Sequence, residues 1–351
     1  MDFLSTLGLS VPVIQAPMAG VSTPELAAAV SNSGALGSIG IGATDTEGAR
    51  SMITDLRART TAPFNVNVFV HADPTPDDAI SAAWCEALRP LFGTYGATPP
   101  DALHVIYKSF AGNEPLIRLL VHLAPPVVSF HFGLPDQDTI EALRQAGCLL
   151  LLTATNLEEA RAAERAGMTA IVAQGYEAGG HRGMFDPSAR DERLPTAALT
   201  RQLVLETALP VIAAGGIMDG AGIRAALDLG AVAAQLGTAF VACPESAADA
   251  GYRAALGRAA QTGTVMTDRL SGRPARCLVN RMTSWADSHT AIPAPPYPIA
   301  YDAAKALNAA AKAAGEYGFG AQWAGQAAAR IRPMPAADLV ALLRSELAAA
   351  S

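Results

Sequence analysis

A repeated alternation of short apolar runs with helical segments predicts an α/β fold built on parallel strands. The runs are almost continuously apolar, as expected of strands that are covered on both faces. Helical stretches with readable starts separate most of them, which favours β/α units. Eight such units in one chain predict a TIM (β/α)8 barrel. The eight runs are Val13–Ala16, Ala35–Ile39, Phe64–Val68, Val127–Phe130, Leu149–Thr153, Ala170–Ala173, Val211–Ala214 and Val232–Leu236.

The helices between these runs begin with side chains that cap helix N-termini. Thr23 precedes Pro24, and proline fits the first helical turn because it has no N–H group that needs a partner. Asn156 and Asp219 stand before two later helical stretches, where their oxygens can accept hydrogen bonds from unpaired N–H groups. These signals place helices on the connections between the predicted strands.

Two segments exceed a minimal barrel, which we assign to residues 1–245. The connection of about residues 73–124, after the third strand, contains the helix-like pieces Asp77–Leu88 and Leu116–Leu123. Residues 246–351 form a long, mostly helical extension. Because barrel enzymes carry their active sites at the carboxyl ends of the strands, we expect the additions to cap that face and complete a substrate pocket.

Composition and charge exclude several classes of protein. Of the 351 residues, 50% are hydrophobic and 16% charged, so a large core is available. The net charge of -7 and the lack of a Lys/Arg run argue against a nucleic-acid partner. No apolar stretch reaches the roughly 18 residues of a membrane helix, and no export signal is visible. The four cysteines are scattered without a metal-ligand spacing, so we expect buried thiols in a reducing, cytoplasmic compartment and no metal site. We expect a monomer or a homodimer.

Three successive strand ends are suited to backbone contact with a flat, phosphorylated ligand. Gly179-Gly180 follows the sixth strand, and glycine lets the backbone approach a ligand closely. The seventh and eighth strands end in Gly215-Gly216 and Gly237-Thr238. In TIM barrels a phosphate frequently lies between these two loops, where backbone N–H groups bind it. Together the three ends predict bound flavin mononucleotide (FMN).

The ends of earlier strands provide groups for the flavin ring. Pro17 and Met18 give a rigid, polarizable surface after the first strand, suited to an aromatic face. Asn67 and Gln174 carry amides that can hydrogen-bond the ring edge or the ribityl hydroxyls. Since there is no GxGxxG fingerprint of a dinucleotide site, the sequence favours FMN over FAD.

Further segments join these motifs: QAPMAG at 15–20, FNVNVF at 64–69, SFHFG at 129–133, QGYEAGGH at 174–181, AAGGI at 213–217, QLGT at 235–238 and SGRPAR at 271–276, then a tyrosine/lysine tail of Tyr297-Pro298, Tyr301 and Lys305, and finally Trp323-Ala-Gly-Gln326. Taken together, these segments resemble those of the nitronate monooxygenases, and SFHFG with the tyrosine/lysine tail resembles their class I. The resemblance and the strand ends give a cofactor-binding set of Gln15, Ala16, Pro17, Met18, Asn67, Gln174, Gly179, Gly180, Gly215, Gly216, Gln235, Leu236, Gly237 and Thr238. Tyr176 stands where related sequences often carry a smaller residue.

The resemblance implies a reaction and its partners. The expected enzyme is an FMN-dependent monooxygenase that oxidises an alkyl nitronate, such as propionate 3-nitronate, with O2 to a carbonyl compound and nitrite. Nitronate and O2 are then the small-molecule partners. FMN would carry the electron chemistry while the protein positions the anion.

His181, directly after the glycine pair, is the predicted catalytic residue. It could act as a base toward a neutral nitroalkane, or it could bind the charge of a nitronate. His131 also follows a strand and is the main rival for the role. Tyr301 and Lys305 share a helix face at i, i+4 spacing and can face an anion. With the resemblance, the predicted substrate-binding residues are Tyr107, His131, Tyr252, Tyr297, Tyr301 and Lys305.

Two other functions remain open at this point. An NAD(P)H-dependent FMN reductase, of the quinone reductase or enoyl-ACP reductase type, would share the AGGH segment at 178–181. A non-catalytic barrel that stores flavin or binds a metabolite would share the glycine pattern. The acidic balance, the SFHFG segment and the tyrosine/lysine tail favour the monooxygenase.

Overall fold

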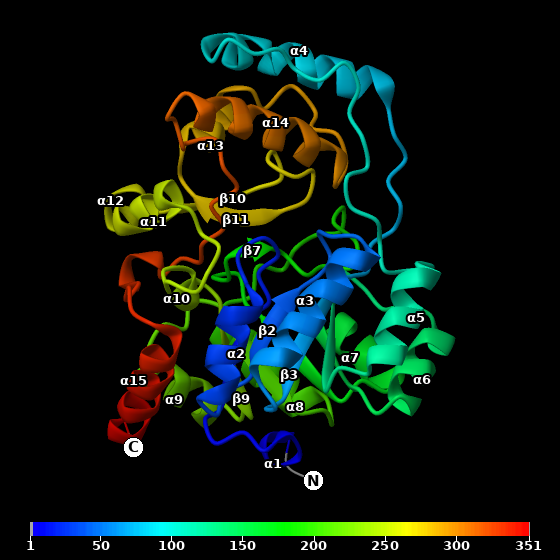
Figure 1. Cartoon of the computed structure of the whole chain (residues 1–351), viewed down its shortest axis with the longest axis vertical. Coiled ribbons are helices and arrows are strands. Elements are labelled where there is room, and N and C mark those ends of the chain that lie inside the picture. Colours follow the sequence, from blue (N-terminus) through cyan, green and yellow to red (C-terminus); the bar gives the residue numbers. More distant parts are fainter. Residues whose placement is uncertain (1–2, 351) are drawn as a thin grey trace.

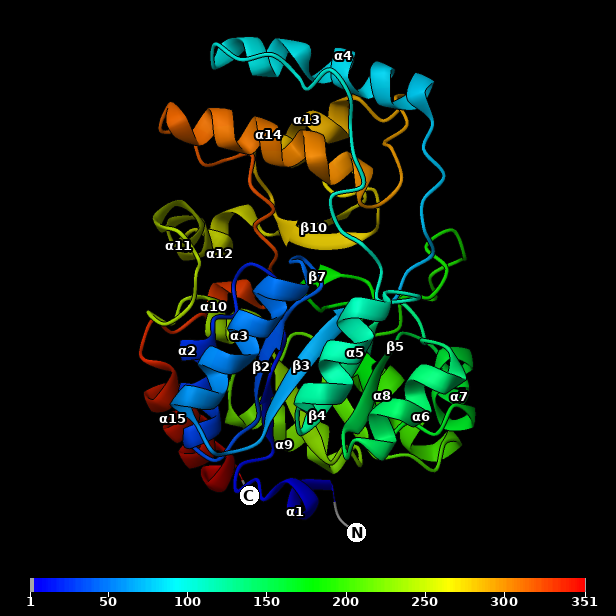
Figure 2. The same ribbon diagram turned by 45° about the vertical axis from the view of Figure 1, so that its right-hand side comes forward.

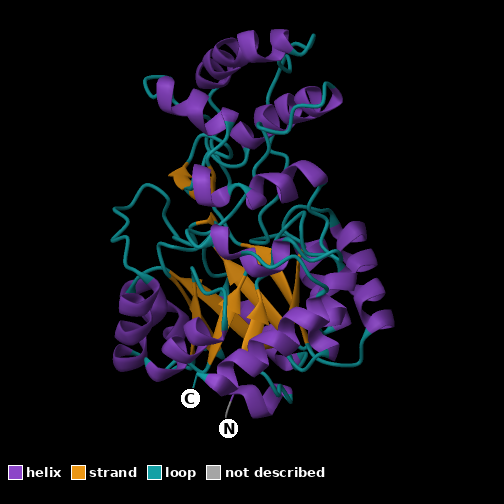
Figure 3. Cartoon of the chain, turned by 90° about the vertical axis from the view of Figure 1, so that its left-hand side faces the viewer, coloured by secondary structure: helices purple, strands orange, loops and turns teal. Residues whose placement is uncertain are grey.

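The computed structural model describes residues 3–350 and contains a parallel barrel. Its eight strands have the order β1-β9-β8-β6-β5-β4-β3-β2, and a bridge between Ile14 and Leu36 joins the two ends of the sheet. Figure 3 shows the strands of this barrel with helices around them. Each neighbouring pair is parallel, which confirms the predicted TIM barrel and its eight strands. The strands are β1 (Val13–Gln15), β2 (Gly37–Gly40), β3 (Phe64–Phe69), β4 (Val127–His131), β5 (Leu149–Ala154), β6 (Ala170–Gln174), β8 (Val211–Ala214) and β9 (Ala233–Leu236).

Helices on the connections surround the barrel, as Figure 1 shows. The side chains of Thr23, Asn156 and Asp219 each accept a backbone N–H at a helix start, so the three predicted caps are confirmed. No helix within residues 3–350 is long and apolar enough to cross a membrane. The surrounding helices are α2 (Pro24–Asn32), α3 (Thr46–Arg59), α5 (Glu114–Leu123), α6 (Gln137–Gln145), α7 (Leu157–Arg165), α8 (Thr196–Glu206), α9 (Gly220–Asp228) and α15 (Ala336–Ala349).

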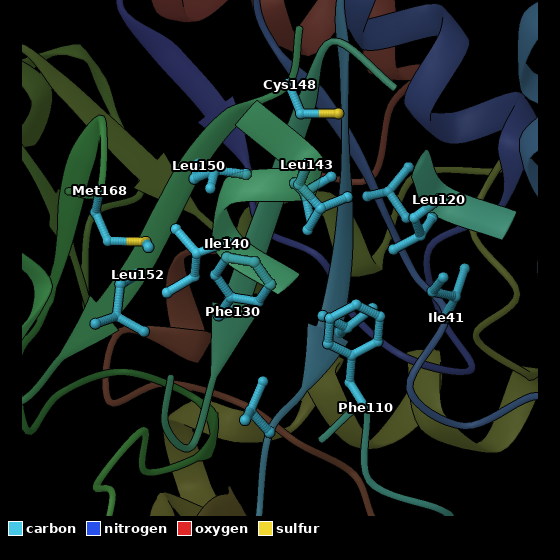
Figure 4. Packing of buried hydrophobic residues seen from close by; sticks show 14 of the residues in the cluster. Ile41, Phe110, Leu120, Phe130, Ile140, Leu143, Cys148, Leu150, Leu152 and Met168 are labelled. Atoms are coloured by element: carbon cyan, nitrogen blue, oxygen red, sulfur yellow. The ribbon is translucent and has the colours of Figure 1, made fainter. Parts of the chain in front are cut away.

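Two apolar layers hold the barrel together. Between the sheet and the helices, side chains such as Phe130, Leu143 and Leu152 interdigitate without contact to water (Figure 4). Inside the barrel, Phe3 and Leu7 of the short helix α1 (Phe3–Leu7) join the apolar cluster at the amino ends of the strands. This end is therefore filled, and the carboxyl ends of the strands remain for a site.

The connection after β3 divides into two parts with different partners. Helix α5 packs against α3 and α6, so it takes the position of an ordinary barrel helix. Helix α4 (Asp78–Thr94) instead lies above the barrel and packs on α14 (Ile299–Ala313), as Figures 1 and 2 show. Trp84, Leu88 and Phe92 on α4 supply the buried contacts of this upper layer.

The C-terminal extension covers the active-site end, but it is not wholly helical. Its strands β10 (Thr264–Thr267) and β11 (Ala275–Leu278) form an antiparallel sheet with β7 (Gly180–His181). The sequence analysis missed this sheet. Strand β11 pairs with β7 across about 95 positions, which no local pattern records, whereas β10 and β11 form a local hairpin within a segment expected to be helical. The last helix, α15, returns to the barrel and packs between α9 and α2. The remaining elements are α10 (Thr238–Val241), α11 (Ala250–Gly257), α12 (Ala259–Thr262), α13 (Arg281–Ser288) and the 3-10 turn η1 (Ala328–Arg330).

Candidate functional site

A cavity of about 700 Å³ lies between the carboxyl ends of the barrel strands and the cap. Its floor is formed by strand ends and the loops that follow them. Its upper wall is formed by side chains of the insertion and the extension, including Tyr107, Tyr301 and Trp323. The position at the carboxyl ends matches the usual place of an active site in this architecture.

One end of the cavity is bounded by backbone. Gly215 and Gly216 adopt φ values of 129° and 70°, which disfavour any side chain at these turns. Gly237 has φ of -105°, and a Cβ there would lie 3.4 Å from Ala16 Cβ, an ordinary van der Waals contact, so neither the turn nor the neighbouring side chains require glycine. Thr238 Oγ1 accepts from the N–H of Gly325 at 3.0 Å, and its own proton remains able to donate.

The glycine pair before His181 serves the packing of the cap. A Cβ on Gly179 would lie 2.5 Å from the backbone nitrogen of Gly325, so only glycine lets these two segments meet. Gly180 has φ of 78° and lines the cavity with Gly179. The close neighbour of Gly179 is therefore the 324–325 backbone, and the predicted approach of this pair to a ligand stays a prediction.

The amide side chains of the predicted set differ in the hydrogen bonds that they already make within the protein. Gln174 donates to the carbonyl oxygen of His181 at 2.9 Å and accepts from the N–H of Gly183 at 2.8 Å, so it orients the loop that carries His181. Asn67 donates to Ser129 Oγ at 2.9 Å. The side chain of Gln235 lines the cavity and makes no hydrogen bond to another described residue, so it is available to a ligand.

Gln15 and Leu236 lie outside the cavity wall. Gln15 is fully buried: its Oε1 accepts from the N–H of Ser38 at 2.8 Å and its Nε2 donates to Ser22 Oγ at 2.9 Å. Leu236 packs in the apolar cluster beside the barrel. Successive side chains of a strand face opposite sides, so a strand end cannot present every residue to one cavity. The other predicted cofactor-binding residues all line the cavity: Ala16, Pro17, Met18, Asn67, Gln174, Gly179, Gly180, Gly215, Gly216, Gln235, Gly237 and Thr238.

The backbone carbonyl of His181 connects the two candidate histidines. His181 Nε2 lies 2.9 Å from Ser271 Oγ, and His131 Nε2 lies 3.1 Å from the carbonyl oxygen of His181. Burial, followed by the nearby His131 and Arg273, lowers the pKa of His181 to about 3. Burial also lowers the pKa of His131 to about 4. Both imidazoles are therefore neutral at neutral pH.

Aromatic rings enclose His181. Its ring centroid lies 4.9 Å from that of Trp323, 5.4 Å from Tyr297 and 5.6 Å from Phe132. The sequence analysis placed Trp323 in a matching motif but assigned it no role. Trp323 lies two residues before Gly325, whose backbone Gly179 approaches. This approach joins distant parts of the chain, so no local pattern predicts that Trp323 reaches His181.

The predicted substrate-binding side chains meet on the upper wall. Lys305 Nζ donates to the Tyr107 hydroxyl at 2.7 Å, and the rings of Tyr107 and Tyr301 lie 5.9 Å apart. Tyr252 donates its hydroxyl to the carbonyl of Trp323, so its polar group anchors the cap. Burial raises the pKa of Tyr252, Tyr297 and Tyr301, so these phenols remain protonated and able to donate. All six predicted residues line the cavity.

The charges around the cavity favour an anion. Asp249 is the acidic residue of the described lining, and Lys312 neutralises it in an ion pair. Within residues 3–350, Lys305 has no carboxylate partner at ion-pair distance. The exposed end of the cavity therefore carries an uncompensated ammonium group.

Arg273, in the SGRPAR segment, lies near both histidines. It is 3% exposed, donates to the carbonyl oxygens of Met184 and Phe185, and stacks 4.0 Å above the Phe132 ring. In the described chain it forms no ion pair, and burial lowers its pKa to about 10. A guanidinium held this way adds positive potential to the histidine cluster.

The comparisons with known proteins agree with this geometry. The sequence matches the family profile described as nitronate monooxygenase over residues 2–346. It is 59% identical over 345 residues to the nitronate monooxygenase of Paraburkholderia phytofirmans, covering 98% of this chain and 94% of the relative. It is 52% identical over 345 residues to the nitronate monooxygenase of Pseudomonas aeruginosa, covering 98% of each.

Solved structures superpose on this chain over nearly its whole length. The crystal structure of nitroalkane oxidase from Streptomyces ansochromogenes superposes with a TM-score of 0.90 at 40% identity, covering 99% of this chain and 98% of that chain. The structure of FabK from Thermotoga maritima superposes with a TM-score of 0.74 at 28% identity, covering 98% and 95%. The chain therefore belongs to the nitronate monooxygenase family and is an oxidoreductase.

Proposed function

We propose that the protein binds FMN and uses it to oxidise alkyl nitronates with O2, giving a carbonyl compound and nitrite. One observation carries the proposal. A single cavity joins a backbone-lined floor, suited to a phosphate, to an uncompensated ammonium group on the opposite wall. Family membership and this pairing support the same cofactor and the same anionic substrate.

The residues of the floor fit FMN. Gly215, Gly216 and Gly237 place backbone at the cavity wall, and the N–H groups of such turns bind a phosphate without cationic side chains. Gln235 offers an unengaged amide for the ring or the ribityl chain. When bound, FMN supplies the electron-accepting chemistry that no side chain of the chain provides.

The upper wall would bind and shield the substrate. The Lys305 ammonium attracts a nitronate, and the hydroxyl of Tyr107 and the protonated phenol of Tyr301 can donate hydrogen bonds to its oxygens. Trp323 and Tyr297 exclude water beside His181, which strengthens these interactions. A second anionic group, as in propionate 3-nitronate, would be favoured at the exposed end near Lys305.

The neutral His181 would act on the carbon-bound proton of a nitroalkane. A preformed nitronate has already lost this proton, so the reaction with nitronate does not require a base. The two substrate forms thus use the same wall but depend on His181 to different degrees.

The test combines cofactor identification with mixing experiments. Flavin released by heat should have the mass of FMN; FAD, or no flavin after reconstitution, contradicts the assignment. Anaerobic addition of nitronate should bleach the flavin, and O2 should restore the yellow colour with release of nitrite. The alternative, an NAD(P)H-dependent FMN reductase, predicts rapid anaerobic bleaching by NADH instead. A flavin-binding barrel without catalysis predicts bleaching by neither.

A further inference from the structure

Ser271 links the catalytic histidine to a backbone carbonyl. It lies in the turn between β10 and β11 and is completely buried. Its Oγ lies 2.9 Å from His181 Nε2 and 3.1 Å from the carbonyl oxygen of Arg273. The hydroxyl therefore has two partners on opposite sides but only one proton to donate.

Which atom donates in each of these two hydrogen bonds follows from the chemistry of the His181 imidazole and the Arg273 carbonyl. A carbonyl oxygen can only accept, so the Ser271 proton goes to Arg273. Ser271 Oγ must then accept from His181, which requires the proton on Nε2. The reverse arrangement would remove this hydrogen bond from a carbonyl in the buried interior, where an unmade hydrogen bond is unfavourable.

The other nitrogen of His181 is the one that opens on the cavity. His181 lines the cavity. Among the described residues, the buried side-chain nitrogen and oxygen atoms that lack a hydrogen-bond partner do not include His181 Nδ1, so this atom is not closed off from the cavity. The same reasoning places the proton of His131 on Nε2 as well, because a carbonyl oxygen can only accept. His131 Nε2 donates to the carbonyl oxygen of His181, which Gln174 Nε2 also reaches, so the two side chains hold the His181 backbone in place.

We propose that Ser271 is a positioning residue that fixes His181 as the Nε2-protonated imidazole, so that the unprotonated Nδ1 faces the substrate. In this tautomer His181 accepts a proton and cannot donate a hydrogen bond to a nitronate. Anion binding is then left to Lys305 and the tyrosines. The role of Nδ1 as a base rests on the proposed function, whereas the tautomer does not.

The charges around His181 support the neutral ring that this tautomer requires. The nearby His131 and the buried His71 and Arg273 disfavour a second proton, and burial of His181 itself is the largest cause of its lowered pKa. Tyr297 packs against the ring with its phenol protonated. Consequently the ring holds a single proton, and Ser271 decides which nitrogen carries it.

Nitrogen NMR of the flavin-loaded protein, labelled with ¹⁵N in its six histidines, tests the tautomer directly. The His181→Asn variant identifies the His181 signals by their loss. At pH 7 we expect Nε2 to carry the proton and Nδ1 to carry none. A proton on Nδ1 overturns the proposal. This result does not depend on any turnover, so it stands or fails separately from the nitronate reaction.

Ser271→Ala tests the positioning role. Losing the acceptor should give a mixture of tautomers and lower kcat with a neutral nitroalkane about 2- to 10-fold, the usual effect of one hydrogen bond. KM and the rate with preformed nitronate should stay unchanged. The matched control is Ser31→Ala, since buried Ser31 also accepts an N–H, from Gly37, and donates to a carbonyl, of Pro63. A Ser271→Ala protein that keeps the wild-type tautomer overturns the role of Ser271.

Discussion

The two ends of the cavity are built from different parts of the chain. The barrel end consists of backbone at Gly215–Gly216 and Gly237, within segments only a few residues long. The cap end consists of side chains brought together from distant positions. Tyr107 and Lys305, for example, share a hydrogen bond although 198 residues separate them in sequence.

This contrast indicates how the fold divides its tasks. Backbone groups at strand ends are the same for any side chain, so a phosphate site built from them tolerates change elsewhere. A wall of side chains can change its shape and charge by single substitutions on a cap that packs separately, through α4 and α14. We therefore expect changes at the barrel end to affect flavin binding and changes at the cap end to affect substrate.

His181 lies where the two ends meet, and its substitution should give the largest effect. We expect His181→Asn to lower activity with a neutral nitroalkane about 10²- to 10⁴-fold, the usual result of removing a general base. Activity with preformed nitronate should fall far less, because no proton has to be removed. Steady-state kinetics with both substrate forms decides this. Equal small losses would assign His181 to positioning, and a loss only in His131→Asn would assign the base to His131.

Gly237→Val tests the barrel end without straining the backbone. The φ of -105° at Gly237 accepts any L-residue, whereas Gly216→Val would also be strained at φ of 70°. The added methyl groups would occupy the floor, so we expect FMN binding to weaken about 10- to 100-fold, as for overpacking. Titration of the apoprotein with FMN measures this change. Gly257→Val, at a helix position with open space, is the control, and equal binding by both variants would contradict the phosphate site.

Acid should destabilise the region where the two ends meet. The pKa of His131 is lowered from 6.5 to about 4, so the unfolded chain binds more protons than the folded chain between these values. The free energy of unfolding should therefore fall as the pH drops from about 6.5 to 4, by up to about 1.4 kcal/mol per pH unit for this histidine. Urea unfolding at several pH values should show a shallower slope in His131→Asn. The exposed His122→Asn should leave the slope unchanged; the same slope in all three proteins would refute the contribution of His131.

Lys305→Met tests the cap end and should give the smallest effect. Because the ammonium is exposed, solvent screens its attraction for an anion, and we expect KM for nitronate to rise about 3- to 10-fold. Flavin reduction at saturating nitronate should change less, since the charge favours the ground state and the transition state alike. Stopped-flow reduction and steady-state KM measure the two effects. Lys108→Met, a neighbouring cation outside the cavity wall, is the control, and an unchanged KM in Lys305→Met would remove Lys305 from the pocket.

The sequence alone determined the barrel and the glycine floor. Eight apolar runs, the N-caps such as Thr23, and the pairs Gly215–Gly216 and Gly237–Thr238 are local signals, because strand burial, capping and turn geometry depend on neighbouring residues. Each of these features appears in the structure where the sequence placed it. The substrate-binding tyrosines came from the resemblance, and no spacing in the sequence would have joined Tyr107 to Lys305.

Only the tertiary structure decided which way the side chains point and what they meet. Gln15 and Gln235 occupy similar strand ends, yet Gln15 is buried in hydrogen bonds to Ser38 and Ser22, whereas Gln235 lines the cavity. The relay from His181 through Ser271 to the Arg273 carbonyl joins segments 90 residues apart. Such contacts depend on how β7 pairs with β11 and on the packing of the cap, which arise from the folding of the whole chain and leave no periodic trace in any one segment.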